Sequence, residues 1–236
     1  MIDVLYIKGE PSSNNDLEML YSLRTLERHV KDLGTVFITG QCPEFIDQGK
    51  VKFLPIRDIG SPMINHWWKV HETIMMTKIS KNFALMYDDI FFIADTKLTK
   101  YPFYQKGFLH QQTDGGEVYQ ESLRNAAEWL ICRGKTIYNH ELHVPCIYNG
   151  PKFIRMAEIY SKKVHEFPGM AVRSVYANLF EFNHPYRKDI KFRTQHDKVE
   201  DIIGTTDCFS VSDQIFGVNA LPWLKKNYTE RSKWEK

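Results

Sequence analysis

Two adjacent carboxylates form the sharpest chemical feature of the sequence. Asp88 and Asp89 stand between two apolar runs, residues 83–87 and 90–93. Placing two charges between such runs is costly unless something pairs with them. Neighbouring carboxylates suit Mg²⁺ or Mn²⁺, hard cations that prefer oxygen ligands and often bridge carboxylates to substrate phosphates. We therefore predict a metal site at Asp88 and Asp89. The alternative is that the pair only caps a turn.

A histidine close to a carboxylate is the second feature. Glu141 and His143 are two positions apart and precede Pro145, so in an extended chain their side chains point to the same side. Glu141 would then orient the imidazole of His143 as a general base or acid. The spacing is His-Glu-x-His, which is not the spacing of the zinc-binding HExxH helix. A histidine with a purely structural role is the alternative.

Two arginines could meet an anionic substrate. Arg24 falls on the same helical stripe as Leu17 and Leu20, so a charge interrupts the face that should meet a sheet. Its guanidinium fork suits phosphate, but it could equally pair with a carboxylate or extend to the surface. Arg173 and Asn178 belong to a weaker polar cluster later in the chain.

One predicted helix carries polar and aromatic side chains just before the acidic pair. Trp67 and Trp68 are neighbours on it and point about 100° apart. At most one should therefore pack in the core, and the other could stack on a sugar or a base. Core packing of both is the alternative. We count Lys69 on this helix, together with Asp3 and Asn178, among the candidates for donor or phosphate binding.

The elements that would position these residues alternate along the first hundred residues. The predicted strands are residues 2–7, 35–39, 51–55 and 83–87, and the predicted helices are residues 16–33 and 64–80. Asn15 and Glu18 predict a capping box at the start of the first helix, and Gly34 predicts its end. This order predicts an α/β domain with a mostly parallel sheet and right-handed crossovers. Ligands of such sheets bind at the carboxyl ends of the strands.

The second half of the chain is less regular. We expect a loop over residues 111–116, helices over 118–131 and 151–165, and a strand over 135–139. Residues 184–198 form a basic, polar tail that contains Arg187, Lys188, Lys191, Arg193 and Lys198.

The composition excludes several classes of protein. A chain of 236 residues with 43% hydrophobic and 25% charged residues can bury a full core, which excludes a disordered, collagen-like or disulfide-stapled chain. Its net charge of +2 argues against a protein held on nucleic acid by bulk electrostatics. No apolar run approaches the roughly 20 residues of a membrane span, and the start is unlike a signal peptide. Four cysteines without a CxxC pair fit a reducing compartment, so a cytoplasmic location is expected.

Taken in order, these pieces resemble the Stealth family of sugar-phosphate transferases, which includes capsular polysaccharide phosphotransferases. Residues 2–6, 15–24 and 37–43 resemble its opening. Tyr87-Asp88-Asp89-Ile90-Phe91-Phe92 is similar to its Asn-Asp-Asp motif, His143-Val144-Pro145 to its His-x-Pro motif, and Arg173-Ser174 with Asn178 to its later arginine motif. The resemblance covers residues 2–180.

The resemblance implies a nucleotide-sugar transferase core of the GT-A kind. With Mn²⁺ or Mg²⁺, such an enzyme moves a sugar 1-phosphate from a nucleotide sugar to an acceptor hydroxyl, for example on a glycan. Asp88 and Asp89 would be metal and diphosphate ligands, and Arg24 and Arg173 phosphate-facing cations. His143 would be the base on the acceptor hydroxyl. The predicted catalytic residues are Asp89, His143 and Arg173.

Departures from the family pattern leave the chemistry open. The segment Ile7-Lys8-Gly9-Glu10 replaces a Thr-Trp-Val-type segment, and Tyr87 replaces an asparagine. Sugar transfer and sugar-phosphate transfer both need an acidic metal site. In either case we expect one domain over residues 1–236, with a nucleotide-sugar-binding half (1–100) and an acceptor-side half with the basic tail (101–236).

Two other functions stay open. One is a glycosyltransferase that modifies hydroxymethylated bases in DNA, which would stack the extruded base on an aromatic side chain. The other is a catalytically inactive module that binds sugars. The presence of both Asp88 and Asp89 disfavours the inactive module.

Overall fold

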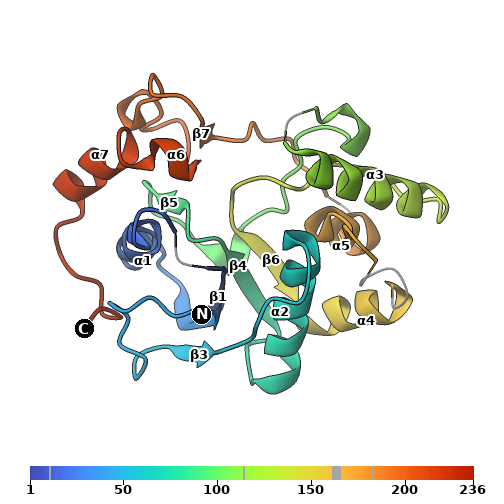
Figure 1. Cartoon of the computed structure of the whole chain (residues 1–236), viewed down its shortest axis with the longest axis horizontal. Helices are drawn as coiled ribbons and strands as arrows, with labels where there is room; N and C mark the ends of the chain where they lie inside the picture. Colours follow the sequence, from blue (N-terminus) through green and yellow to red (C-terminus); the bar gives the residue numbers. More distant parts are fainter. Residues whose placement is uncertain (11, 114, 161–165, 182) are drawn as a thin grey trace.

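A five-stranded sheet forms the centre of the computed structural model, which describes residues 1–10, 12–113, 115–160, 166–181 and 183–236 (Figure 1). Its strands are β1 (Ile2–Lys8), β2 (Leu33–Gly40), β3 (Lys52–Leu54), β4 (Asn82–Met86) and β6 (Cys146–Asn149), in the order β3-β2-β1-β4-β6. The first four pair in parallel, and β6 joins β4 antiparallel. The predicted α/β class with a mostly parallel sheet is confirmed.

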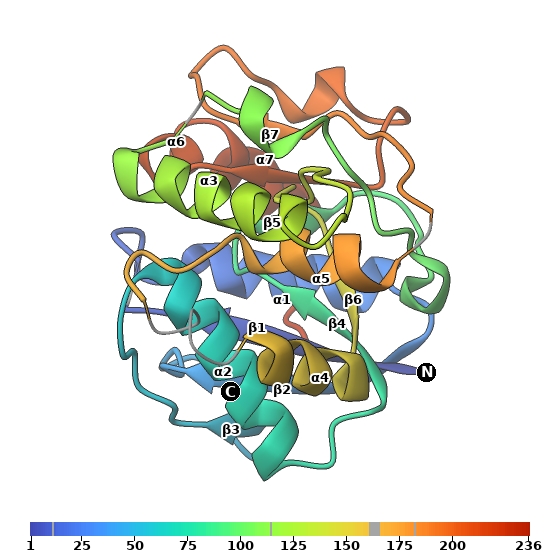
Figure 2. The ribbon, with the colours of Figure 1, turned by 90° about the vertical axis from the view of Figure 1, so that its right-hand side faces the viewer.

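Helices cover both faces of this sheet. One face packs on α1 (Leu17–His29), and the other on α2 (Pro62–Met76), α4 (Gly150–Tyr160) and α5 (Val172–Phe180), with α3 (Glu117–Ile131) beyond α5 (Figures 1 and 2). Alternate residues of a strand point to opposite faces. Val4 and Tyr6 accordingly pack in the core beneath α1, and Leu5 packs in the core beneath α2.

A second, smaller sheet lies beside α1. It contains β5 (Ile90–Phe92), β8 (Cys208–Val211) and β7 (Lys191–Phe192), in the order β5-β8-β7, and is followed by α6 (Asp213–Phe216) and α7 (Ala220–Asn227). Phe91 of β5 packs between Phe209 and Phe216 at centroid separations of 5.2 and 5.9 Å. Because β5 directly follows Asp89, this sheet brings residues of the C-terminal part to the acidic pair.

The bounds of two predicted helices shift for local reasons. The second helix begins at Pro62 because the Ser61 hydroxyl accepts a hydrogen bond from the Ile64 amide at 3.3 Å and proline suits the first helical position. The first helix ends at His29 because Val30 leaves it to form a bridge with Thr96.

The predicted capping box at the first helix is wrong. Asp16 precedes the helix in a left-handed conformation (φ 58°) and makes no side-chain cap bond. The Glu18 carboxylate instead accepts from Ser12 Oγ at 2.7 Å and from Asn14 Nδ2 at 2.5 Å. The predicted end at Gly34 is also wrong, because Gly34 lies within β2.

The predicted strand over residues 135–139 is wrong as well. Only Tyr138 forms a β-bridge there, with Phe108. The side chain of Asn178 forms hydrogen bonds with both the amide and the carbonyl of Tyr138. The strand of this region is β6, which the sequence did not predict. The helix predicted over 118–131 is confirmed as α3, and the one over 151–165 as α4, while residues 161–165 lie outside the described residues. None of the described helices is both long and apolar enough to cross a membrane.

Candidate functional site

The acidic pair lies in the turn between β4 and β5, at the carboxyl edge of the central sheet. Lys8 Nζ at the end of β1 is 3.3 Å from Asp88 Oδ2. Asp89 Oδ2 accepts hydrogen bonds from Ser210 Oγ at 2.7 Å and from Lys191 Nζ at 3.1 Å. The two carboxylates therefore have different partners, one from the first half of the chain and the other from the C-terminal part.

The electrostatics of the two carboxylates differ accordingly. Burial and the neighbouring charge of Asp89 raise the pKa of Asp88 to about 6, although Lys8 opposes the shift. Burial also acts to raise the pKa of Asp89, but Lys191 and His143 outweigh it and lower that pKa. Lys8 therefore compensates Asp88 only in part, and the pair retains negative charge.

The donor set of this turn fits a hard divalent cation held by few protein ligands. Among the described residues, Oδ1 of Asp88 and Oδ1 of Asp89 accept no hydrogen bond, and Mg²⁺ commonly uses one or two carboxylates together with water and substrate phosphate. The residues that the structure describes contain no group of three or more His, Cys, Asp or Glu side chains arranged to hold a metal. The remaining ligands would have to come from water and from a substrate.

His143 is oriented by Asp189. Its ring Nδ1 donates to Asp189 Oδ2 at 2.9 Å, and its backbone amide donates to Asp189 Oδ1 at 2.9 Å. Lys106 Nζ lies 3.4 Å from the same carboxylate. His143 and Lys106 lower the pKa of Asp189 against the effect of burial, so the carboxylate is ionised and the Nε2 atom of His143 is left for other chemistry.

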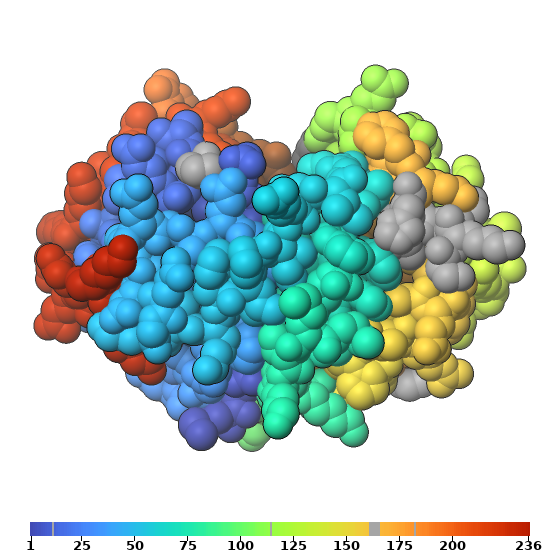
Figure 3. Space-filling view, turned by 60° about the horizontal axis from the view of Figure 1, so that its bottom comes forward, coloured from blue at the N-terminus to red at the C-terminus, as the bar shows by residue number. Residues whose placement is uncertain are grey.

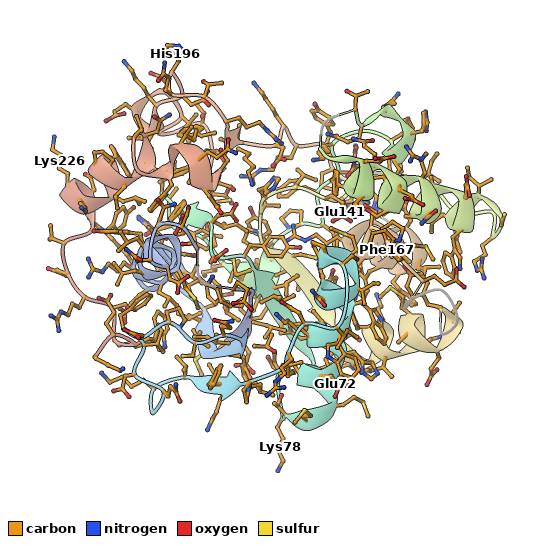
Figure 4. The ribbon with its side chains drawn as sticks, viewed as in Figure 1. Glu72, Lys78, Glu141, Phe167, His196 and Lys226 are labelled. Carbon is orange, nitrogen blue, oxygen red and sulfur yellow. The ribbon has the colours of Figure 1, made fainter. Side chains whose placement is uncertain are left out.

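The predicted pairing of His143 with Glu141 is wrong. Glu141 Oε1 accepts hydrogen bonds from the Ser174 amide and hydroxyl, both at 3.0 Å. These bonds direct the carboxylate toward α5 and away from the imidazole. Figure 4 labels Glu141, which lies inside the molecule near α3 and α5.

Arg173 supports the His143 segment from beneath. Its Nη1 donates to the carbonyl of Leu142 and, at 3.1 Å, to that of Val144, the two residues that flank His143. The guanidinium lies 4.4 Å from the centre of the Tyr87 ring. The side chain is 1% exposed, and its Nε and Nη2 have no hydrogen-bond partner among the described residues. A buried guanidinium with two unused donors favours an anion as its missing partner.

His143 and Arg173 line one cavity of about 500 Å³, together with Tyr87, the residue before the acidic pair, whereas Asp88 and Asp89 themselves do not line it. Its walls come from the end of β1, the start of α2, the end of β4, and segments of the second half. They include Asp58, His66, Lys69, Tyr87, Lys106, Tyr119, Glu141, His143, Arg173 and Arg193. The space-filling view shows the surface hollowed between the C-terminal part and the part that contains α3 (Figure 3). The cavity is therefore of the size that small-molecule sites use.

The sequence did not single out His66, which the structure places in this cavity. It is 3% exposed, and its Nδ1 and Nε2 lie 2.9 and 3.2 Å from the hydroxyls of Tyr87 and Tyr148. Burial lowers its pKa well below the ordinary value, so it is a neutral link between two tyrosines. Its spacing of three positions from Lys69, which places both on one helix face, could have identified it.

Lys69 is the one donor-binding candidate of the α2 helix that lines the cavity. It is 2% exposed, forms an ion pair with Asp58 at 2.6 Å, and donates to the Lys8 carbonyl at 2.8 Å. Trp67 and Trp68 do not line the cavity. Trp67 is buried in the core between the sheet and α2, and Trp68 packs against that core. These positions correspond to the alternative of core packing, with Trp67 buried and Trp68 partly buried.

Three other candidates form hydrogen bonds or ion pairs with other parts of the fold. Arg24 makes a bidentate pair with Glu235 at 2.8 and 2.7 Å and donates to the Tyr228 carbonyl, which corresponds to the ion-pair alternative. Asp3 lies near the amino end of β1, at the opposite edge of the sheet, and accepts from backbone amides of β2 and of the α2–β4 connection. The side-chain amide of Asn178 forms hydrogen bonds with the backbone of Tyr138 and with the hydroxyl of Thr136. None of the three lines the cavity.

No family model matches the sequence, and no curated protein is similar to it in sequence. In structure it is similar to the galactosyltransferase LgtC in complex with donor and acceptor sugar analogs, with a TM-score of 0.55, 10% identity and 98% of each chain covered. An active-site mutant of LgtC gives the same values. The glycosyltransferase GlyE of Streptococcus pneumoniae TIGR4 matches with a TM-score of 0.41 at 13% identity, over 80% of this chain and 45% of that one. The chain therefore has the GT-A glycosyltransferase fold, with its acidic pair at the carboxyl edge of the sheet.

Proposed function

We propose that the protein is a transferase that takes a nucleotide sugar as donor and transfers a sugar or a sugar 1-phosphate to an acceptor hydroxyl. The observation that carries the proposal is the proximity of an acidic pair and an oriented histidine on a GT-A fold. The pair directly follows Tyr87, and Tyr87 lines the same cavity as His143 and Arg173. Residues 1–100 would supply most of the donor side, and residues 101–236 the acceptor side.

Asp88 and Asp89 would hold Mn²⁺ or Mg²⁺ through their carboxylate oxygens. A divalent ion at this position supplies charge neutralisation for the departing nucleoside phosphate. The unused Nε and Nη2 groups of Arg173 would donate hydrogen bonds to a phosphate oxygen in the cavity. Lys69 would be a second cation in the wall of the same cavity.

His143 would act as the base on the acceptor. Its Nε2 takes the proton of the acceptor hydroxyl, and the ionised Asp189 stabilises the imidazolium that results. In sugar transfer the acceptor oxygen bonds to the anomeric carbon, and the bond from that carbon to the diphosphate breaks. In sugar-phosphate transfer the oxygen bonds to the β-phosphorus, and the bridging P–O bond breaks to release a nucleoside monophosphate.

The Stealth-like chemistry is the sugar-phosphate form of this proposal, and the fold of LgtC, a galactosyltransferase by name, favours the sugar form.

DNA as the acceptor has less support. Arg187 of the basic tail is paired with Asp207 at 2.5 Å and Lys191 with Asp89, so only part of the tail is available to a polyanion. Of the two tryptophans that could have stacked a base, Trp67 is buried in the core and Trp68 packs against it.

Incubation with a panel of nucleotide sugars and Mn²⁺ or Mg²⁺ tests the proposal. Release of nucleoside diphosphate identifies sugar transfer, and release of monophosphate identifies sugar-phosphate transfer. Asp89→Asn should abolish metal-dependent donor binding while the fold is retained. No turnover of any donor, together with no thermal shift from donor plus metal, would leave only the inactive binding module. A gel shift of hydroxymethylated DNA at low salt would restore the DNA alternative.

A further inference from the structure

Each carboxylate of the acidic pair is matched by a lysine. Lys8 Nζ is 3.3 Å from Asp88 Oδ2, and Lys191 Nζ is 3.1 Å from Asp89 Oδ2. Lys8 also pairs with Asp16 at 2.9 Å and so compensates Asp88 only in part. A divalent cation at this turn would therefore enter a site that already contains counter-ions.

The two lysines are held very differently. Lys8 is 3% exposed and has three oxygen partners, because Asp16 lies at 2.9 Å and the Glu10 carbonyl at 2.9 Å in addition to Asp88. Lys191 is 17% exposed and comes from β7, a strand of two residues. Within the part of the chain that the structure describes, Asp89 is the one oxygen partner of its ammonium group. Lys8 is thus held by three oxygen partners, whereas only the contact with Asp89 holds the ammonium group of Lys191.

We propose that Lys191 is an intramolecular counter-cation that competes with the divalent metal for Asp89. The inference depends on the metal site of the proposed function. A metal bound to Asp89 and an ammonium group on the same carboxylate repel each other strongly at such short range. Ser210 Oγ, which also contacts Asp89 Oδ2 at 2.7 Å, is neutral and does not oppose the metal. Lys191 must therefore leave when the metal binds.

This competition has a consequence for the order of binding. The metal alone binds weakly because it must displace an ion pair without providing a new partner for the ammonium group. A donor diphosphate provides that partner, since its oxygens can accept from the displaced Lys191. Metal and donor therefore bind more tightly together than either does separately.

Direct titration with Mn²⁺ in the absence of any donor tests the inference, with the signal of free Mn²⁺ in electron paramagnetic resonance as the readout. Lys191→Met keeps the length of the side chain and removes its charge. We expect this variant to bind Mn²⁺ at least about tenfold more tightly than the unmodified protein, as loss of a close charge pair implies. Lys191→Gln should behave in the same way and guards against a folding defect of the first variant.

Lys188→Met is the matched control, because Lys188 is an exposed lysine three positions away on the same segment. Its Mn²⁺ affinity should equal that of the unmodified protein. Asp89→Asn combined with Lys191→Met should remove the gain. Unchanged or weaker Mn²⁺ binding in both Lys191 variants would overturn the inference, even if donors turn over. Tighter binding without turnover of any donor would support the inference and count against the proposed function.

Discussion

The carboxylate of Asp189 accepts two hydrogen bonds from His143, one from the backbone amide and one from ring Nδ1, both at 2.9 Å. These two hydrogen bonds to one carboxylate fix the backbone position of His143 and the rotation of its ring. Because a carboxylate only accepts, Nδ1 must carry the proton, and the free Nε2 is the acceptor. This is the tautomer that a general base needs.

Asp189→Asn should reverse this tautomer. The asparagine oxygen can still accept from the His143 amide, but its NH₂ group then faces Nδ1 and favours an unprotonated Nδ1 with the proton on Nε2. We expect kcat to fall by about 100-fold or more, within the range of general base catalysis, with little change in the KM for the donor. In ¹⁵N NMR, the chemical shift typical of a protonated ring nitrogen should move from Nδ1 to Nε2 of His143.

Glu141→Gln is the control for this prediction, because Glu141 is the partner that the sequence favoured. Glutamine keeps an acceptor for the two bonds from Ser174. The His143 ring shifts should therefore stay as they are in the unmodified protein. A change of tautomer in this variant and not in Asp189→Asn would contradict the assignment of the orienting residue.

Sequence periodicity was sufficient for the parts of the fold that depend on neighbouring residues. The parallel strands, α1, α2 and the turn with Asp88 and Asp89 follow from apolar spacing and from a local charge between two buried runs. The failures share a different cause. Asp189 is 46 positions from His143, and Lys191 is 102 positions from Asp89, so no local pattern records these pairs.

The surroundings of Arg24 and Asn178 differ from the prediction for the same physical reason. A guanidinium on an apolar helix face needs a partner, but the sequence around Arg24 does not reveal that this partner is Glu235, 211 positions away. Similarly, the tertiary contacts of Asn178 decide the conformation around Tyr138, which local propensity assigned to a strand. Long-range pairing therefore limits how far site residues can be predicted from one sequence.

Gly40→Ala should be strongly destabilising. Gly40 has a φ of 107°, and an added Cβ would lie 1.9 Å from the Lys8 carbonyl oxygen, which accepts from Lys69. The clash and the left-handed backbone together should cost roughly 3 kcal/mol or more of unfolding free energy. Urea denaturation measures this loss. Gly9→Ala is the control, since an added Cβ there meets nothing within 4 Å, and similar midpoints for both variants would refute the prediction.

The stability of the fold should fall as the pH drops below about 6.5, the ordinary pKa of histidine. Burial lowers the pKa of His140 to about 3, so the unfolded chain takes up a proton in this window while the folded state does not. Stability is then complete above the unfolded pKa and is lost toward pH 3. His140→Asn retains a donor for the Tyr104 carbonyl and should reduce this dependence in urea denaturation series, while the part that comes from buried His66 remains. His196→Asn, at an exposed site, should leave it unchanged.

Arg24 and Glu235 should stabilise the fold together and have no part in donor binding. Their two hydrogen bonds, at 2.8 and 2.7 Å, join α1 to the C-terminal residues. In a double-mutant cycle of Arg24→Met and Glu235→Gln, we expect a coupling free energy of about 1–2 kcal/mol, because both groups share one partly buried ion pair. The KM for the donor should be the same in all three variants. Additive losses of stability, combined with a large rise of this KM in Arg24→Met alone, would instead assign Arg24 to phosphate.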